Sequence, residues 1–331
     1  MKTTNLKAWG LMLLLPFLTL SLFAQGPNNS GTYYQSADRL KGKDLKTAMF
    51  KIIKKHNPLS YDELWTAFKT TDKRADGKVW DMYSNATDFT FGNDQAGNYK
   101  NEGDVYNREH SFPKKWFGGK VAPMYTDLVH LVPTDGYVNN RRSDYPFGET
   151  KGEKYKSNND FSKLGYCTYP GYTGIVFEPN DEYKGDFARI YFYMATAYED
   201  KITSWTKCPI MQKDKYQPYQ DWQQKMLMEW SEKDAVSQKE IDRNAGIWYL
   251  QQNRNPFVDY PGLEEYIWGS KKDVAFSYDN YQEPTGVTFV TVETKPLDSG
   301  DWYNMNGQKI GKKKPAKKGV YIHHGKKVVV E

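Results

Sequence analysis

The feature that most restricts how this chain can fold is the stretch between residues 106 and 144, where two extended segments are followed at once by a helix signal. Residues 106–113 are compatible with a strand, and residues 128–132 are apolar and β-branched, which favours a second strand. Thr134 is a plausible N-cap for a helix that contains Asn139. The stretch therefore predicts a strand, a connection, a second strand and a helix in close succession.

Amphipathic helices are predicted on both sides of this stretch. Two of them open with a capping box, in which a serine and a glutamate three residues later satisfy each other's backbone amides. The apolar spacing places helices near residues 45–53, 60–68, 187–198, 218–230 and 237–252. We therefore expect an α+β fold: a mostly helical, loop-rich domain around the strand–strand–helix unit, plus a small C-terminal β appendage.

The two ends of the chain differ in character from its middle. Residues 1–24 have the basic, apolar and small-residue regions of a secretory signal, and their apolar run is too short for a membrane span. Residues 270–285 resemble a polar linker in composition, and residues 286–331 alternate as short strands of the appendage. The main domain is then expected over residues 25–269.

The formal net charge of +5 is unevenly distributed. The signal segment holds Lys2 and Lys7, and residues 286–331 hold nine Lys against four Asp or Glu, which leaves the middle of the chain slightly acidic. Any binding of a polyanion by the main domain must therefore come from a local patch and not from a general positive field.

Two cysteines, Cys167 and Cys208, are present. In an exported protein an even number of cysteines favours a disulfide, which here would close a long loop. Two free buried thiols are the alternative. A metal site built on cysteine is excluded, because neither Cys has a second metal-ligating residue at close spacing.

Three residues of the opening stretch have the chemistry of a phosphodiester-cleaving site. His110 is a natural general base, because an unperturbed histidine is largely neutral near pH 7. The Glu109 carboxylate and the Asn139 amide supply oxygen ligands of the kind that Mg²⁺ accepts, with Mn²⁺ or Ca²⁺ as alternatives. A Glu-His pair by itself is common, and His130, inside an apolar strand, is better explained as structural.

Beyond these residues, the chain resembles the bacterial endonuclease I family of secreted and periplasmic nucleases, which are ββα-metal (His-Me finger) enzymes. The resemblance covers roughly residues 30–265, and it rests on the Asn-Arg-Glu-His-Ser-Phe-Pro run at 107–113, the segment from Asp127 to Ser143, and residues 185–194 and 253–258. It implies a divalent-metal-dependent endonuclease that acts on DNA and RNA through the phosphate backbone, by in-line attack of water, leaving 5′-phosphate ends.

By position, the resemblance also implies the role of each site residue. His110 matches the general base, and Glu109 and Asn139 match the metal ligands. A main-chain carbonyl, which falls at about Tyr125, would hold the other ring nitrogen of the base and fix its tautomer.

One departure from the family concerns the cation that grips the phosphate. The family carries an arginine between the base and this carbonyl, but no arginine occurs between His110 and Arg141. The role is assigned to Arg142 as the preferred candidate. The other candidates for phosphate contact are Arg108, Arg141, Lys114 and Lys115.

The C-terminal residues resemble the sorting segments of exported Bacteroidetes-type proteins, in particular residues 303–309 and 319–322. This implies type IX secretion through a partner machinery, and a location outside the cell or on its surface; without such sorting, the protein would be periplasmic. The alternative is that the lysines at 312–318 add affinity for phosphate backbones. We expect a monomer.

Two other functions compete with a metal-dependent nuclease. An aromatic-rich surface protein could bind glycans or nucleic acid without cleaving them, but binding does not require Glu109, His110 and Asn139 together. A ribonuclease that works through the 2′-hydroxyl would need no metal and would leave DNA intact.

Overall fold

The computed structural model describes residues 26–281, 302–303, 309–317, 319–323 and 326–330. The chain divides into two units, residues 1–282 and 283–331. The predicted signal segment and the strand expected near residues 287–292 lie outside the described residues. Among the described residues, none of the helices has the length and apolarity that a membrane crossing requires.

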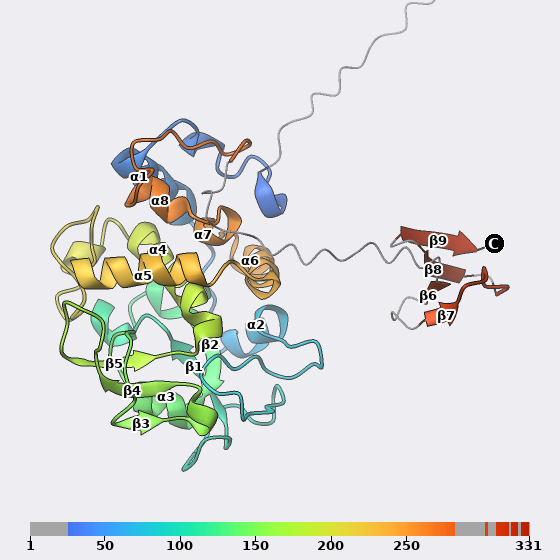
Figure 1. Ribbon diagram of the computed structural model, residues 1–331, viewed down its shortest axis with the longest axis horizontal. Helices are drawn as coiled ribbons and strands as arrows, with labels where there is room; N and C mark the ends of the chain where they lie inside the picture. Colours follow the sequence, from blue (N-terminus) through green and yellow to red (C-terminus); the bar gives the residue numbers. More distant parts are fainter. Residues whose placement is uncertain (1–25, 282–301, 304–308, 318, 324–325, 331) are drawn as a thin grey trace, which may run out of the picture. The chain divides into compact units, whose positions relative to one another are not determined.

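The first unit contains a strand–strand–helix motif, as the sequence predicts, which is drawn in the lower half of this unit in Figure 1. Strand β1 (Tyr106–His110) pairs antiparallel with β2 (Leu131–Asp135), and helix α3 (Gly136–Arg142) follows directly. The second strand begins three residues later than expected. The helix is capped by Asp135, whose carboxylate accepts a hydrogen bond from the Val138 amide at 2.8 Å. Thr134, the expected cap, belongs instead to the buried strand.

The helices pack around one long buried helix, α4 (Lys184–Ala197), in which every residue after Lys184 is buried. It packs against α1 (Gly42–Ile53), α5 (Asp221–Lys233) and α7 (Pro256–Asp259). The remaining helices are α2 (Leu64–Thr71), which packs against α6 (Gln238–Gln251), and α8 (Leu263–Ile267), which packs against α1. The five expected helical segments are all present, and the Ser237–Glu240 capping box of α6 is formed.

Short elements complete this unit. An antiparallel sheet of three strands runs in the order β3 (Tyr155–Lys156), β4 (Lys163–Tyr166), β5 (Ile175–Glu178). The 3₁₀ helices are η1 (Pro27–Asn29), η2 (Gln35–Ala37), η3 (Lys114–Phe117), η4 (Met124–Thr126), η5 (Asn158–Asp160), η6 (Asp181–Tyr183) and η7 (Ile202–Ser204). Mixed helices and small sheets make this an α+β fold.

Residues 270–281 are not the free linker that their composition predicts. Phe276 is buried, and its backbone amide donates to the carbonyl of Leu40 at 2.8 Å. The hydroxyl of Tyr260 donates to the carbonyl of Tyr278 at 2.7 Å. The aromatic side chains of this segment extend the core of the first unit, which the polar residues between them conceal in the sequence.

The second unit is a small antiparallel sheet, as expected for the appendage. Its strands are β6 (Trp302–Tyr303), β7 (Lys309–Gly311), β8 (Gly319–His323) and β9 (Lys326–Val330), in the order β7-β6-β8-β9. The ring of Trp302 stacks on that of His323, with centroids 4.2 Å apart.

The two cysteines are free thiols in the structure. Cys167 follows β4 and pairs through its backbone with Gly174, whereas Cys208 is buried in the loop after η7. The structure therefore has the free-thiol alternative and not the disulfide, although only Cys208 is fully buried.

Candidate active site

The end of β1 places the expected base in a buried aromatic pocket. The Nε2 atom of His110 lies 3.0 Å from the carbonyl oxygen of Tyr125, as the resemblance implies. A carbonyl can only accept, so Nε2 carries the proton and Nδ1 is the free acceptor of the neutral ring. Burial lowers the pKa of His110 well below its usual value, and the neighbouring charges of His130 and Lys114 lower it further. His110 is therefore neutral and able to accept a proton near pH 7.

The carboxylate of Glu109 is held through one of its two oxygens. The hydroxyl of Tyr83 donates to Oε1 at 2.9 Å, and Nη1 of Arg142 lies 3.1 Å from the same atom. Burial raises the pKa of Glu109, whereas the charge of Arg142 and the Tyr83 hydroxyl oppose that rise. With Oε1 fixed, Oε2 is the oxygen left to bind a ligand.

Asn139, the other expected metal ligand, lies on α3. It is half-buried, and its side chain makes no hydrogen bond to the described part of the chain. No group of three or more His, Cys, Asp or Glu residues suitable for a metal occurs in the described ranges. A pair of hard oxygen donors with few protein ligands fits Mg²⁺, which keeps several of its waters, better than it fits zinc.

Arg142 does not have the placement that a phosphate-binding residue requires. Its side chain is 1% exposed. Besides its ion pair with Glu109, Nη2 donates to the carbonyl of Ser111 at 2.6 Å and Nη1 to that of His110 at 3.2 Å. The preferred phosphate role predicted for Arg142 is therefore not supported. The guanidinium instead braces the end of β1 and the Glu109 carboxylate.

Two other arginines are also engaged elsewhere. Arg108 lies over the rings of Tyr61 and Trp65, at 3.6 and 4.2 Å from their centroids. Arg141 bonds the hydroxyl of Tyr137 one helical turn earlier. Because residues two apart on a helix point in nearly opposite directions, Arg141 faces away from the side that carries Asn139.

The two lysines after β1 differ in whether their charge is paired. Lys115 pairs with Asp144 at 2.7 Å. Lys114 is exposed and has no ion-pair partner within the described ranges. Burial is the largest cause of the pKa shifts of Glu109 and His110, and the positive charge of Lys114 contributes by lowering the pKa of both. Lys114 is thus the expected phosphate contact that best fits its surroundings.

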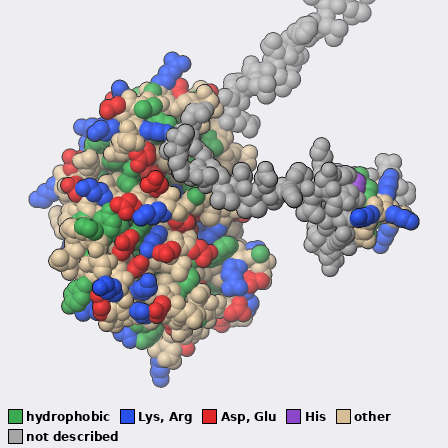
Figure 2. Space-filling model, viewed as in Figure 1, with side chains coloured by type: hydrophobic (Ala, Val, Ile, Leu, Met, Phe, Trp, Pro, Cys, Tyr) green, Lys and Arg blue, Asp and Glu red, His purple; other side chains and the backbone are tan. Residues whose placement is uncertain are grey.

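The face of the larger unit that Figure 2 shows has no broad basic field. On the face shown in Figure 2, Lys and Arg side chains are interspersed with Asp and Glu over the larger unit. This agrees with the slightly acidic middle of the chain and leaves phosphate attraction to local groups.

Sequence reasoning missed Tyr83, which lies 26 residues before Glu109 in the chain and bonds its carboxylate. The segment that carries Tyr83 is tied to the core motif by Asp81, whose carboxylate accepts from the backbone amides of Tyr83 at 2.8 Å and Asp135 at 3.0 Å. No local pattern marks Tyr83, because the contact depends on a loop that is distant in the sequence and packs against β1 only in the folded chain.

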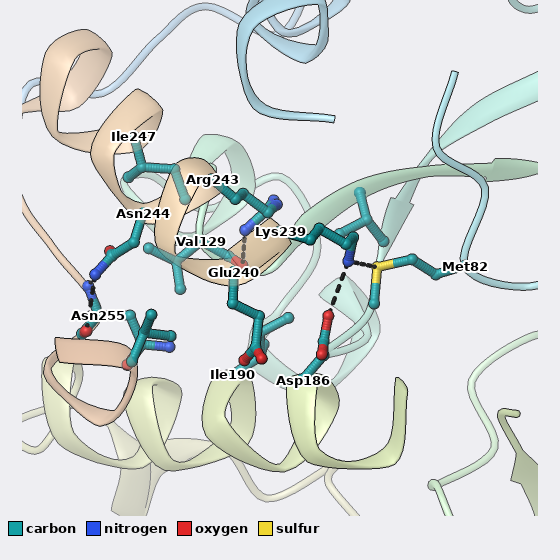
Figure 3. A pocket seen from close by; sticks show the side chains of 12 residues that line it. Met82, Val129, Asp186, Ile190, Lys239, Glu240, Arg243, Asn244, Ile247 and Asn255 are labelled. Atoms are coloured by element: carbon teal, nitrogen blue, oxygen red, sulfur yellow. Dashed lines mark hydrogen bonds and ion pairs between the residues drawn. The ribbon is translucent and has the colours of Figure 1, made fainter. Parts of the chain in front are cut away.

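A small cavity next to the motif belongs to the scaffold (Figure 3). It has a volume of about 20 Å³ and lies between α4 and α6, with Val132 of β2 in its wall. Lys239 pairs with Asp186 across one side at 2.8 Å and contacts the sulfur of Met82 at 3.2 Å (Figure 3). This space suits about one water molecule and is far too small for a nucleotide.

The chain was compared with known proteins. Residues 41–262 match the model of the family described as Endonuclease I. An extracellular ribonuclease of Bacillus subtilis (strain 168) is 35% identical over 260 residues, which cover 76% of this chain and 83% of the relative. An Endonuclease-1 of Buchnera aphidicola subsp. Baizongia pistaciae (strain Bp) is 28% identical over 40% of this chain and 46% of the relative. A periplasmic deoxyribonuclease of Aeromonas hydrophila is 26% identical over 41% and 48%, respectively.

The family match covers more than half of the chain and includes the whole strand–strand–helix motif with Glu109, His110 and Asn139. The expectation from the sequence motif is thereby confirmed at the level of the family. The chain belongs to the endonuclease I family of nucleases.

Proposed function

We propose that the protein is a secreted, sugar-non-specific endonuclease that hydrolyses DNA and RNA with the help of a divalent cation such as Mg²⁺. The observation that carries this proposal is the pairing of His110 Nε2 with the Tyr125 carbonyl. It leaves Nδ1 as a base, and the next residue along the strand, Glu109, has a carboxylate with one oxygen fixed and one oxygen available. The buried His130 has a similar contact between Nε2 and the Met124 carbonyl at 2.7 Å. What a binding module or a scaffold does not need is such a histidine together with the Glu109 carboxylate next to it in the sequence.

The chain's own residues divide the chemistry between them. His110 Nδ1 takes the proton of the attacking water, and Nε2–H keeps the ring in place. Glu109 Oε2 and the Asn139 amide oxygen would hold the cation, while Tyr83 and Arg142 keep the carboxylate oriented. The cation, when bound, supplies positive charge to the phosphate and to the leaving oxygen. Departure of the 3′-oxygen, which takes up a proton from a solvent water, would leave a 5′-phosphate and a 3′-hydroxyl.

Lys114 is proposed as the side chain that grips the scissile phosphate. Among the candidates Arg108, Lys114, Lys115, Arg141 and Arg142, only Lys114 and Arg141 are exposed and without an ion pair in the described residues. Arg141 is bonded to the Tyr137 hydroxyl, whereas Lys114 has no such partner in that part of the chain. A lysine acts as a point charge and does not need the bidentate geometry of arginine. It can therefore replace the missing family arginine.

The substrate class follows from the absence of any motif for base readout. Contacts to phosphates carry no sequence information, so a site built on a cation, a base and Lys114 acts on any backbone it can reach. The relatives bear names of both kinds, an extracellular ribonuclease and a periplasmic deoxyribonuclease. These names support activity on both sugars and a location outside the cytoplasm. The C-terminal sheet is proposed to serve type IX sorting.

The experiment that tests this function is digestion of plasmid DNA and of structured RNA by the purified chain, with Mg²⁺ or with EDTA. We expect cleavage of both substrates, loss of cleavage in EDTA, and a decrease of about 10²-fold or more in His110→Ala, the scale of removing a general base. Cleavage of RNA alone in EDTA would favour a metal-independent ribonuclease. Binding without cleavage in any divalent metal would favour a binding module.

A further inference from the structure

The carbonyl that holds the base lies on a short turn and not on a regular strand. Tyr125 is the middle residue of η4, a 3₁₀ helix of three residues. Its amide donates to the carbonyl of Val121 at 2.9 Å, but such a turn alone leaves the direction of the Tyr125 carbonyl weakly fixed. One side of the turn is held by His130, whose Nε2 lies 2.7 Å from the carbonyl of Met124. Since His110 depends on the Tyr125 carbonyl for its tautomer, the Tyr125 side of the turn needs a support of its own.

A stack of four groups meets this need. The ring of Tyr61 lies nearly parallel to that of Tyr125, with centroids 4.6 Å apart and planes at 20°. The guanidinium of Arg108 covers Tyr61 at 3.6 Å and also lies over Trp65 at 4.2 Å. The order Trp65, Arg108, Tyr61, Tyr125 therefore joins helix α2, strand β1 and turn η4.

Arg108 also fixes the segment that carries Tyr61 through its polar contacts. Nη1 of Arg108 donates to the carbonyl of Tyr61 at 2.6 Å and lies 3.3 Å from the carboxylate of Asp62. The arginine is thus bonded to the backbone of the residue on whose ring it lies. Because Arg108 and His110 belong to the same strand, the stack holds the Tyr125 turn in a fixed position relative to the strand that carries the base.

We propose that Tyr61 is a positioning residue for His110: it fixes the Tyr125 turn, and through the Tyr125 carbonyl it sets the tautomer and the direction of the imidazole. This inference rests on the proposed function of His110 as general base. Tyr61 acts through another residue and does not touch the substrate. The Tyr61 hydroxyl also interacts with the Tyr125 side chain, but the role is assigned to the ring face, which makes the stacking contacts with Tyr125 and with Arg108.

The proposal is tested by three variants of the full chain, Tyr61→Ala, Tyr61→Leu and Tyr61→Phe, with Tyr33→Ala as control. Tyr33 is a half-buried tyrosine packed edge-on against Tyr34 and Trp248, outside this stack. We expect Tyr61→Ala to lower kcat about ten-fold, with KM within about two-fold of wild type, since small displacements of a catalytic group are costly. Tyr61→Phe should restore kcat to within about two-fold of wild type.

A second readout does not depend on activity. Nitrogen NMR of the His110 ring should show a single tautomer with the proton on Nε2 in wild type and Tyr61→Phe, and a mixture of both tautomers in Tyr61→Ala. Tyr61→Leu replaces the alanine variant if the latter does not fold. The proposal would be overturned if Tyr61→Ala or Tyr61→Leu had the same His110 tautomer and the same kcat as the control Tyr33→Ala. Failure of wild type to cleave would reject the proposed function, and the NMR comparison would still decide the positioning role.

Discussion

Tyr83 offers the sharpest test of how the candidate metal ligand is held. Tyr83→Phe removes one hydroxyl from a fully buried ring and leaves Glu109 Oε1 with Arg142 as its remaining partner. A hydrogen bond to a charged group contributes about 1.5–3 kcal/mol. Since every 1.4 kcal/mol is about ten-fold in affinity, the variant should bind Mg²⁺ about 10- to 100-fold more weakly, the range found for partners of metal ligands.

The assay is the rate of plasmid cleavage as a function of Mg²⁺ concentration. We expect the midpoint of activation to rise by that factor while the rate at saturating metal stays within about three-fold of wild type. Tyr106→Phe is the matched control. Tyr106 is a buried tyrosine on β1, the strand that carries Glu109, but its hydroxyl donates to Gln95 at 3.3 Å and not to Glu109. A midpoint in Tyr83→Phe equal to that of Tyr106→Phe would refute the reasoning that Glu109 binds the cation through an oxygen aligned by Tyr83.

Two further predictions follow from charges near the site and in the scaffold. Lys114→Ala should slow cleavage by between about five-fold and 10³-fold, because an ammonium about 4 Å from a phosphate contributes about 1 kcal/mol in water and about 4 kcal/mol near a protein surface. Lys115→Ala should have little effect, and a substrate with a neutral methylphosphonate at the scissile position should remove the difference between Lys114→Ala and wild type. Burial raises the pKa of Asp234 to about 7, helped by the charge of Asp186. The folded state then binds this proton more tightly than the unfolded chain, so the stability that it contributes is present at low pH and is lost as pH rises through about 4 to 7. Chemical denaturation across this range should show a smaller decline in the free energy of unfolding for Asp234→Asn than for wild type. Parallel curves for the two proteins would contradict the assignment.

Local signals in the sequence were sufficient for much of the fold. The capping box at Ser237 and Glu240 and the apolar spacing of residues 187–198 depend on neighbours within one or two helical turns, and both helices are found. The strand–strand–helix motif was predictable for the same reason. Its exact register was not, because Thr134 and Asp135 are both good caps and only the pairing of β2 with β1 selects Asp135.

The candidate site was predictable in its chemistry but not in its electrostatics. Arg141 and Arg142 are adjacent and identical in type, yet one is exposed and the other is buried against Glu109. The start of α3 decides this, since it places Val138 and Arg142 one turn apart on the buried face. A shift of two residues in the helix start would reverse the faces, and sequence patterns do not locate helix ends that closely.

The partners of the site residues could not be predicted from the sequence for another reason. Tyr83 and Tyr61 approach β1 from segments 26 and 47 residues earlier in the chain. Tyrosines are abundant in this sequence, with 26 in the chain, so composition gives no basis for choosing two of them. Only long-range packing identifies which rings reach Glu109 and Tyr125.

The most direct test of the account is the identity of the product ends. Short DNA and RNA oligonucleotides of one sequence should be digested in Mg²⁺ and in water enriched in oxygen-18, and the fragments should be weighed by mass spectrometry. The account predicts 5′-phosphates and 3′-hydroxyls from both substrates, with one heavy oxygen in each new 5′-phosphate. Fragments with 2′,3′-cyclic phosphates from RNA, together with intact DNA, would contradict it.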